Sequence, residues 1–318
     1  MKRYAAIDVG TNTILLLIAG KGADGRLHTI FDGETTTRLG QGLAKTGEIN
    51  AHALEKSIHV IERYLSLCRK EGVTEIVAAG TSALRDAQNR WEFLRTVRRR
   101  CGLEVEIISG EEEARLSYLP VARDRKWSSG TLVVVDIGGG STEWIYGGVR
   151  DQVLVFSEDI GSVRVTERFL TSDPVQEREY HAMASHVRKA VSNIPPAGPD
   201  ATLVGIGGTI TALCSVKHGL REFDPSRIHH GLLTLKDIQA QIQQLRTLPL
   251  RVRETIPGLP SERADVILAG AAILLHSLLR LGSDRIWVSI HGLRHGLLLD
   301  RFFGGCCPKP LSLTEKDF

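Results

Sequence analysis

The residues with the clearest chemical potential are two carboxylates that bracket a glycine turn in segment 134–143, which reads VVDIGGGSTE. Asp136 ends a β-branched run, and Glu143 follows three glycines and two hydroxyls. Glycine lets backbone N–H groups approach an anion closely, and hydroxyls add donors. Two carboxylates side by side on a hairpin can hold a hard divalent cation against phosphate oxygens. The segment predicts a phosphate-binding hairpin with a Mg²⁺ site: phosphate donors Gly138, Gly139, Gly140, Ser141 and Thr142, and metal ligands Asp136 and Glu143.

Two further turns repeat parts of this layout. Segment 6–13 (AIDVGTNT) again places a carboxylate before a glycine and hydroxyls, and an apolar run follows. Segment 204–211 (VGIGGTIT) opens a predicted helix, whose N-terminus is a favourable place for an anion. A lone glycine turn is often only structural, but the acids, the hydroxyls and the repetition favour phosphate binding. These turns add the phosphate donors Thr11, Asn12, Gly208 and Thr209, and the metal ligand Asp8, for which a turn-capping role is the simpler alternative.

Composition indicates a globular protein of about two domains. The chain has 318 residues, of which 42% are hydrophobic and 24% charged, and its formal net charge is +3. This mild charge argues against a dedicated nucleic-acid-binding protein, which usually carries a concentrated basic surface. Five cysteines without metal-ligand spacing favour reduced thiols. The apolar segment 266–281 is too short to span a bilayer, so we expect a cytoplasmic protein that binds neither membrane nor nucleic acid.

The elements that position the glycine turns alternate between strands and helices, which indicates an α/β fold. Segment 51–70 has helical periodicity, with an apolar stripe on one face. The polar stretch 123–130 is the best candidate for a linker. We therefore predict domains at 1–124 and 125–318, with a last helix at about 296–318 as a candidate to pack back on the first domain.

A helix is also predicted directly after Ser109. Ser109 and Glu112 have the spacing of a capping box, and three successive acids occupy the first turn. These acids could simply complement the helix dipole. Because the helix lies beside the predicted linker, Glu113 could instead face the space between the domains.

The order of these motifs resembles the exopolyphosphatase / guanosine pentaphosphate phosphohydrolase family. The resemblance rests on AIDVGTNT, GTSALRDA at 80–87, ISGEEEA at 108–114, DIGGGSTE and GIGGT at 205–209, and it covers nearly the whole chain. It implies the short form of the family, with two actin-like ATPase (ribonuclease H-like) domains and a cleft between them. A homodimer is compatible with it.

The resemblance also implies hydrolysis of a terminal phosphoanhydride with Mg²⁺, on inorganic polyphosphate or guanosine pentaphosphate. Glu113 matches the family's catalytic glutamate, the base for the attacking water. Arg85 lies in the family's phosphate-contacting segment, and its planar fork suits a phosphate, although an ordinary helix-end arginine is the simpler alternative. Two other readings are weaker: an actin-like kinase or ATPase, and a non-catalytic alarmone-binding regulator, which would not need all of Glu113, Asp136 and Glu143.

Two features of the C-terminal half do not support a further metal site. Ile290 stands where the family usually has an aspartate after a serine, which removes a metal or water contact there. His229, His230 and His291 show no partnered ligand spacing, and we predict that they are polar loop residues.

Overall fold

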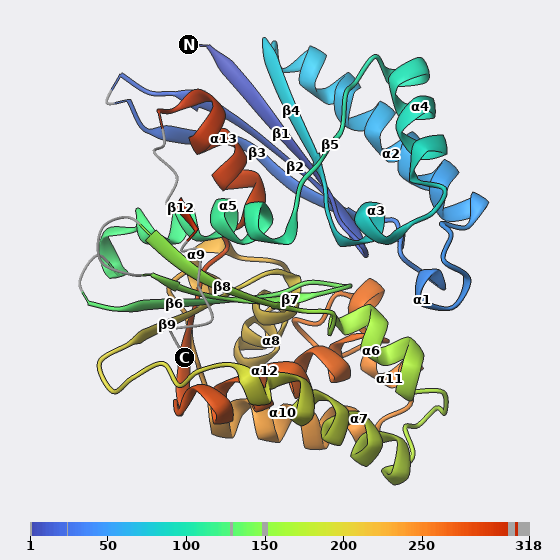
Figure 1. Cartoon of the computed structure of the whole chain (residues 1–318), viewed down its shortest axis with the longest axis vertical. Coiled ribbons are helices and arrows are strands. Elements are labelled where there is room, and N and C mark those ends of the chain that lie inside the picture. The colour runs from blue at the N-terminus through green and yellow to red at the C-terminus, as the bar shows by residue number, and fades with distance from the viewer. Residues whose placement is uncertain (1, 24, 128–129, 148–151, 305–308, 311–318) are drawn as a thin grey trace, which may run out of the picture.

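Two mixed β-sheets with their own helices form two lobes, shown one above the other in Figure 1. The computed structural model describes residues 2–23, 25–127, 130–147, 152–304 and 309–310. In the first sheet the strand order is β3-β2-β1-β4-β5; β1 to β3 are antiparallel, and β4 and β5 run parallel to β1. The elements of this lobe are β1 (Arg3–Val9), β2 (Thr13–Lys21), β3 (Leu27–Thr36), α1 (Leu43–Thr46), α2 (Ala51–Lys70), β4 (Glu75–Gly80), α3 (Ser82–Asp86), α4 (Arg90–Cys101) and β5 (Glu106–Ile107).

The second sheet repeats this plan and extends it at both edges. Its order is β10-β11-β9-β6-β7-β8-β12, and the five strands β8-β7-β6-β9-β11 match the first sheet in order and direction. This repetition confirms the predicted pair of similar α/β halves. The strands are β6 (Leu132–Ile137), β7 (Thr142–Gly147), β8 (Gln152–Glu158), β9 (Thr202–Ile206), β10 (Leu232–Thr234), β11 (Arg285–Val288) and β12 (Lys309–Pro310).

Helices cover the outer face of the second sheet, on the lower side in Figure 1. The most apolar of them, α12, is buried along nearly its whole length in the largest core of the molecule. The helices are α6 (Ser162–Phe169), α7 (Glu177–Ala190), α8 (Gly208–His218), α9 (Pro225–Ile228), α10 (Leu235–Thr247), α11 (Leu250–Arg253) and α12 (Ile267–Leu281), with 3-10 turns at Arg125–Trp127, Val191–Asn193 and Ser261–Arg263. No helix in the described ranges combines the length and hydrophobicity needed to span a membrane.

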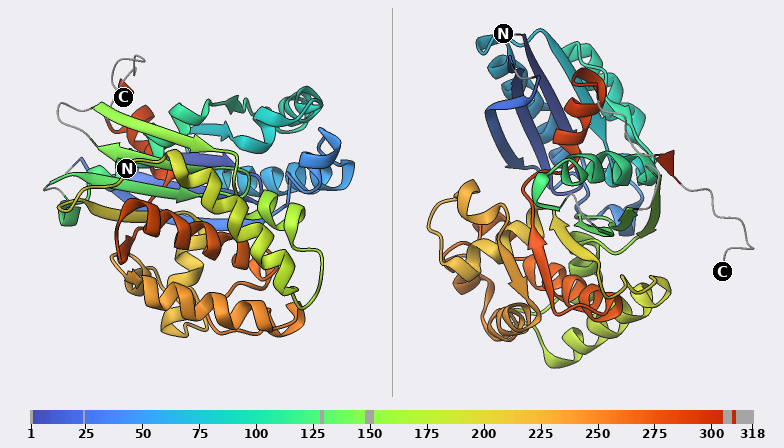
Figure 2. Two further views of the ribbon diagram at one scale, coloured as in Figure 1. Left: turned by 60° about the horizontal axis from the view of Figure 1, so that its bottom comes forward. Right: turned by 90° about the vertical axis from the view of Figure 1, so that its left-hand side faces the viewer.

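Two helices lie between the sheets. α5 (Gly110–Ala122) packs on β6, β7 and β8 of the second lobe and against α13 (Leu293–Phe302), which packs on β1. Figures 1 and 2 show α13, in red, beside the blue strands of the first lobe although it comes from the end of the chain. The closing helix therefore packs on the first lobe and ends at Phe302; the rest of the predicted 296–318 segment includes residues 305–308 and 311–318, which lie outside the described ranges.

Side-chain alternation then decides which way the acids point. In β1, Ala5 and Ile7 pack toward α2, so the opposite face carries Tyr4, Ala6 and Asp8 toward α5 and α13. In β6, Val133 and Val135 pack toward the outer helices, so Asp136 shares the α5 side with Val134. The two sheets thus present their acidic strand ends to the same helix, α5.

Candidate active site

The tips of the two glycine hairpins meet at one cavity of about 450 Å³ between the lobes. A methyl group added to Gly139 would lie 3.0 Å from the Cβ of Thr11, a tight contact, so glycine favours the close approach of the second hairpin to the first. The third turn reaches the same cavity through Gly207 and Gly208 at the start of α8. The three turns picked out by their sequence pattern therefore surround a single space, which also contains the side chains of Asp8, Asn12, Glu113 and Asp136.

The hairpin tips are built to leave their N–H groups available. The carbonyl oxygens of Gly138 and Gly139 accept from the N–H groups of Ser162 and Val163, each at 2.9 Å. In the first hairpin, Thr11 O accepts from Gly40 N at 2.8 Å. Within the described ranges, the N–H groups of Gly139 and Thr11 donate to no protein acceptor. Because the carbonyl oxygens of the tips accept hydrogen bonds from the protein while these N–H groups have no acceptor, the tips can bind an anion.

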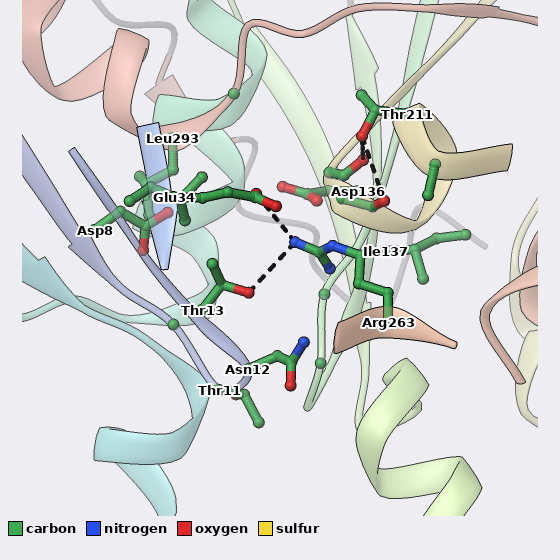
Figure 3. Close-up of a pocket in the computed structure, with 18 of the residues that line it drawn as sticks. Asp8, Thr11, Asn12, Thr13, Glu34, Asp136, Ile137, Thr211, Arg263 and Leu293 are labelled. Atoms are coloured by element: carbon green, nitrogen blue, oxygen red, sulfur yellow. Dashed lines mark hydrogen bonds and ion pairs between the residues drawn. The ribbon is translucent and has the colours of Figure 1, made fainter. Parts of the chain in front are cut away.

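Asn12 adds an unsatisfied donor at the same place. Its side chain is buried, and its Nδ2 has no hydrogen-bond partner among the described residues. Figure 3 shows Asn12 beside Thr11, facing the space that Asp8 and Asp136 also border. A buried amide without an acceptor is costly, and a phosphate oxygen in the cavity would satisfy it.

Four carboxylates lie close enough to interact. Asp136 and Glu143 are direct cross-strand partners in the β6–β7 hairpin, and Glu113 enters from the first turn of α5. Burial and the charge of Glu113 raise the pKa of Asp136 to about 7. Burial, helped by Glu113 and Asp136, also raises the pKa of Asp8 to about 8, against the lowering effect of Arg294. This concentration of partly buried acidic groups suits a divalent cation.

Direct coordination of one ion by all three predicted ligands is not preformed. In the described ranges Asp8, Asp136 and Glu143 do not form a group whose donor atoms all lie within 4.8 Å of one another. Glu143 is buried, does not line the cavity, and accepts from Ser157 Oγ at 3.1 Å. Mg²⁺ commonly keeps several waters and takes only one or two carboxylates, so the arrangement fits Mg²⁺ held in part through water.

Glu113 is held by the arginine that the sequence also singled out. Arg85 Nη1 donates to Glu113 Oε2 at 2.6 Å and to Ile108 O at 3.1 Å. Burial raises the pKa of Glu113, and the Arg85 guanidinium opposes that shift. Arg85 is not among the residues that line the cavity, so in this structure it orients Glu113, and a direct phosphate contact stays a prediction.

Two predicted phosphate donors do not line the cavity. Thr142 Oγ1 donates to Ile160 O at 2.5 Å, and its side chain is fully buried outside the cavity. Thr209 packs against Gly270 of α12, and its backbone N–H lies in the first turn of α8. The Thr142 hydroxyl is therefore not available to a phosphate in this structure, and a phosphate contact from Thr209 stays a prediction. Ser141 and Gly138 remain in the cavity wall.

Two cavity arginines were missed by sequence reasoning. Arg263 reaches from the second lobe across the cavity, where its Nη2 lies 3.2 Å from Glu34 Oε2 and 3.3 Å from Thr13 Oγ1 (Figure 3). Its guanidinium lies so close to Gly208 that any side chain there would collide with it. Arg294, at the start of α13, pairs with Asp32 at 2.7 Å. Both bring positive charge to a cavity otherwise rich in acids, and the segment that holds Arg263 has no motif that would have marked it.

Comparison with known proteins agrees with this geometry. The family model described as the Ppx/GppA phosphatase family matches residues 17–302. The chain belongs to the Ppx/GppA phosphatase family. It is 33% identical over 315 residues to exopolyphosphatase 2 of Mycobacterium tuberculosis. The aligned region covers 94% of this chain and 98% of the relative. Membership confirms the predicted family and makes the protein an enzyme that hydrolyses phosphoanhydrides.

Solved structures support the same assignment. A Ppx/GppA family member from Aquifex aeolicus superposes with a TM-score of 0.80 at 36% identity, over 95% of this chain and 98% of that one. An exopolyphosphatase from Cytophaga hutchinsonii superposes with a TM-score of 0.85 at 27% identity, over 97% of this chain and 100% of that one. A nucleoside triphosphate hydrolase from Neospora caninum shares only 10% identity at a TM-score of 0.51, over 95% and 92%, and extends the likeness to the fold alone. The predicted actin-like fold is confirmed.

The predicted departure from the family pattern also lies at the cavity. Ile290 borders it and packs partly against the core of the second lobe. An isoleucine offers no ligand atom, so this part of the wall is apolar. Arg294, which follows four residues later, lines the same cavity.

The raised pKa of Asp8 predicts that this residue lowers the stability of the metal-free protein. A folded-state pKa of about 8, above the ordinary aspartate value, means that stability from this group is greatest at low pH and is lost as pH rises through 8. In metal-free protein, Asp8→Asn should therefore raise the melting temperature, by more at about pH 8.5 than at about pH 6. Calorimetry at both pH values measures this, with exposed Glu48→Gln as the control. An equal or negative shift at the higher pH would show that Asp8 is not a strained buried acid.

Proposed function

We propose that the protein is an exopolyphosphatase, which hydrolyses the terminal phosphoanhydride of inorganic polyphosphate and releases orthophosphate. The observation that carries the proposal is the meeting of both hairpin tips at one cavity that also contains the Glu113 carboxylate. Phosphoryl transfer needs a held phosphate, neutralised charge and a positioned nucleophile, and little covalent chemistry from the protein.

The proposed roles follow from position. The N–H groups of the hairpin tips and the Asn12 amide hold the terminal phosphate, and the guanidinium of Arg263 faces the same space. Glu113 accepts the proton of the attacking water, and Arg85 orients its carboxylate. Burial raises the pKa of Glu113 toward the working pH, where a base is most effective.

Asp136, Asp8 and Glu143 would hold Mg²⁺, directly or through water. When bound, Mg²⁺ neutralises charge on the phosphate oxygens and withdraws it from the leaving group. Without a cation, these acids and a polyphosphate tail would repel one another, so Mg²⁺ is expected to be required for productive binding.

A second candidate is guanosine pentaphosphate 5′-phosphohydrolase. One observation favours it: the cavity extends to Phe223, a residue that is 60% exposed, and to Pro225. An exposed aromatic ring at the end of a phosphate cavity offers a stacking surface for a purine. Inorganic polyphosphate has no group that would use this ring.

A substrate panel separates the two candidates. Phosphate release is measured on long polyphosphate, tripolyphosphate, guanosine pentaphosphate and ATP, with and without Mg²⁺. We expect Mg²⁺-dependent release, fastest on polyphosphate, and no change on polyphosphate for Phe223→Ala. Faster release from guanosine pentaphosphate, lowered by Phe223→Ala, would favour the second candidate, and activity on ATP alone would remove both.

A further inference from the structure

A cluster of side chains outside the catalytic cavity has the composition of a transition-metal site. Asp124, His229 and His230 each offer a donor atom, and these atoms all lie within 4.8 Å of one another. Asp124 Oδ2 lies 2.6 Å from His230 Nε2 and 3.2 Å from His229 Nε2. No spacing rule could predict this group, because the aspartate lies in the stretch taken for a linker, far in sequence from the histidines.

The cluster lies well away from the predicted Mg²⁺ site. Asp124 follows the C-terminal end of α5, whereas Glu113 lies in the first turn of that helix. Eleven residues of helix span about 16 Å at 1.5 Å per residue. A metal ion at this cluster would therefore be separate from the cation that serves catalysis.

The carboxylate is oriented before any ion arrives. Asp124 Oδ1 accepts from the Lys126 N–H at 2.9 Å, which directs Oδ2 toward the two imidazoles. Metal-binding carboxylates are commonly fixed through such a second hydrogen bond. Only 13% of the Asp124 side chain and 19% of that of His229 are exposed, so both are largely removed from water.

The backbone at His230 has an uncommon conformation. Its φ is 67°, in the left-handed region, where residues other than glycine are uncommon. The His230 N–H donates to Val288 O at 2.8 Å, which fixes the loop to β11 and aims the ring at Asp124. Strained backbone of this kind gathers at ligand sites, where the strain helps to position a side chain.

One tryptophan and one further histidine lie beside the cluster. Trp127 lies edge-on to His230 with ring centroids 4.9 Å apart, and His291 lies 4.5 Å from His229.

We propose that Asp124, His229 and His230 bind one Zn²⁺-like transition-metal ion, with His291 beside the open position. Imidazole with a single carboxylate is a donor set for Zn²⁺ and its neighbours, and a poor one for Mg²⁺. Ligand atoms around a tetrahedral Zn²⁺ lie about 3.3 Å apart, so the group needs small movements to accept it. The ion would fasten the end of α5 to the loop before β10, and so tie the helix that carries Glu113 to the second lobe.

The test is a calorimetric titration of the untagged full chain with Zn²⁺ after chelator treatment, in the presence of saturating Mg²⁺ to occupy the catalytic site. We expect one equivalent bound per chain. His230→Gly is the decisive variant, because glycine accepts the left-handed backbone at this position, which offsets part of the contacts that the ring loses. Loss of a ligand should weaken binding by more than about 100-fold, above the 10–100-fold typical of outer-shell partners.

A second readout separates a built site from adventitious binding. Co²⁺ in place of Zn²⁺ should give the intense visible absorption of a tetrahedral ion, and this absorption should vanish in His230→Gly and Asp124→Asn. His276→Ala, a change to a half-buried histidine on α12, is the matched control and should bind as the unaltered chain does. Absence of a stoichiometric site, or equal binding by His230→Gly and the control, would overturn the proposal and leave these contacts as hydrogen bonds only.

Discussion

Replacement of Glu113 by glutamine should lower kcat for phosphate release by about 10²-fold or more, with little change in KM. The amide keeps the size of the side chain and can still contact Arg85, but it cannot accept a proton from water. Since Arg85 Nη1 lies 2.6 Å from the carboxylate, the substitution removes charge without removing the contact that orients the side chain. The measurement is initial-rate phosphate release on polyphosphate at saturating Mg²⁺.

The neighbouring acids provide the controls. Glu111 is exposed, and Glu112 pairs with Arg115 at 2.6 Å. If the first turn of α5 needed acids only to complement the helix dipole, Glu111→Gln and Glu112→Gln would lower activity as much as Glu113→Gln does. Normal turnover by Glu113→Gln would exclude this residue as the base.

Asp136→Asn should raise the Mg²⁺ concentration needed for half-maximal activity by about 10-fold or more, with lower activity even at saturation. The asparagine removes one charge from a cross-strand pair of carboxylates, and hard cations prefer carboxylate oxygens. Because the pKa of Asp136 is raised to about 7, the unaltered enzyme should also need less Mg²⁺ as pH rises through 7, when the carboxyl loses its proton.

The measurement is a Mg²⁺ titration of activity at about pH 6.5 and about pH 8 for both proteins. The pH dependence of the Mg²⁺ requirement should be weaker in Asp136→Asn, since one titrating ligand is gone. Glu48→Gln serves as the control, because Glu48 is exposed and does not line the cavity. An unchanged Mg²⁺ titration in Asp136→Asn would refute its metal role.

Local signals made much of the fold predictable. The helix predicted at 51–70 is observed at Ala51–Lys70, because its apolar stripe, its Asn50 N-cap and the following turn all agree. Ser109 caps α5 as expected by accepting from the Glu112 N–H. The glycine turns could be predicted because the close approach of backbone to an anion requires glycine, and glycines in this spacing can be recognised in the sequence.

Long-range contacts account for what the sequence did not show. Arg263 reaches Glu34 across 229 positions, and only the packing of the two lobes brings them together. The sequence shows that Thr142 lies in a glycine turn, which predicts a phosphate donor. It does not show that the hydroxyl donates to Ile160 O, because that contact forms only in the folded chain. Asp124 was assigned to a polar linker, yet it contacts His230, and the nearby Trp127 is buried.

The most direct measurement is a crystal structure of Glu113→Gln with Mg²⁺ and a short polyphosphate. We expect the terminal phosphate to lie between the hairpin tips, to contact the N–H groups of Thr11 and Gly139, and to have a water within hydrogen-bonding distance of residue 113. We also expect Mg²⁺ beside Asp136. A polyphosphate chain bound outside this cavity, with no phosphate between the two hairpins, would contradict the proposed mechanism.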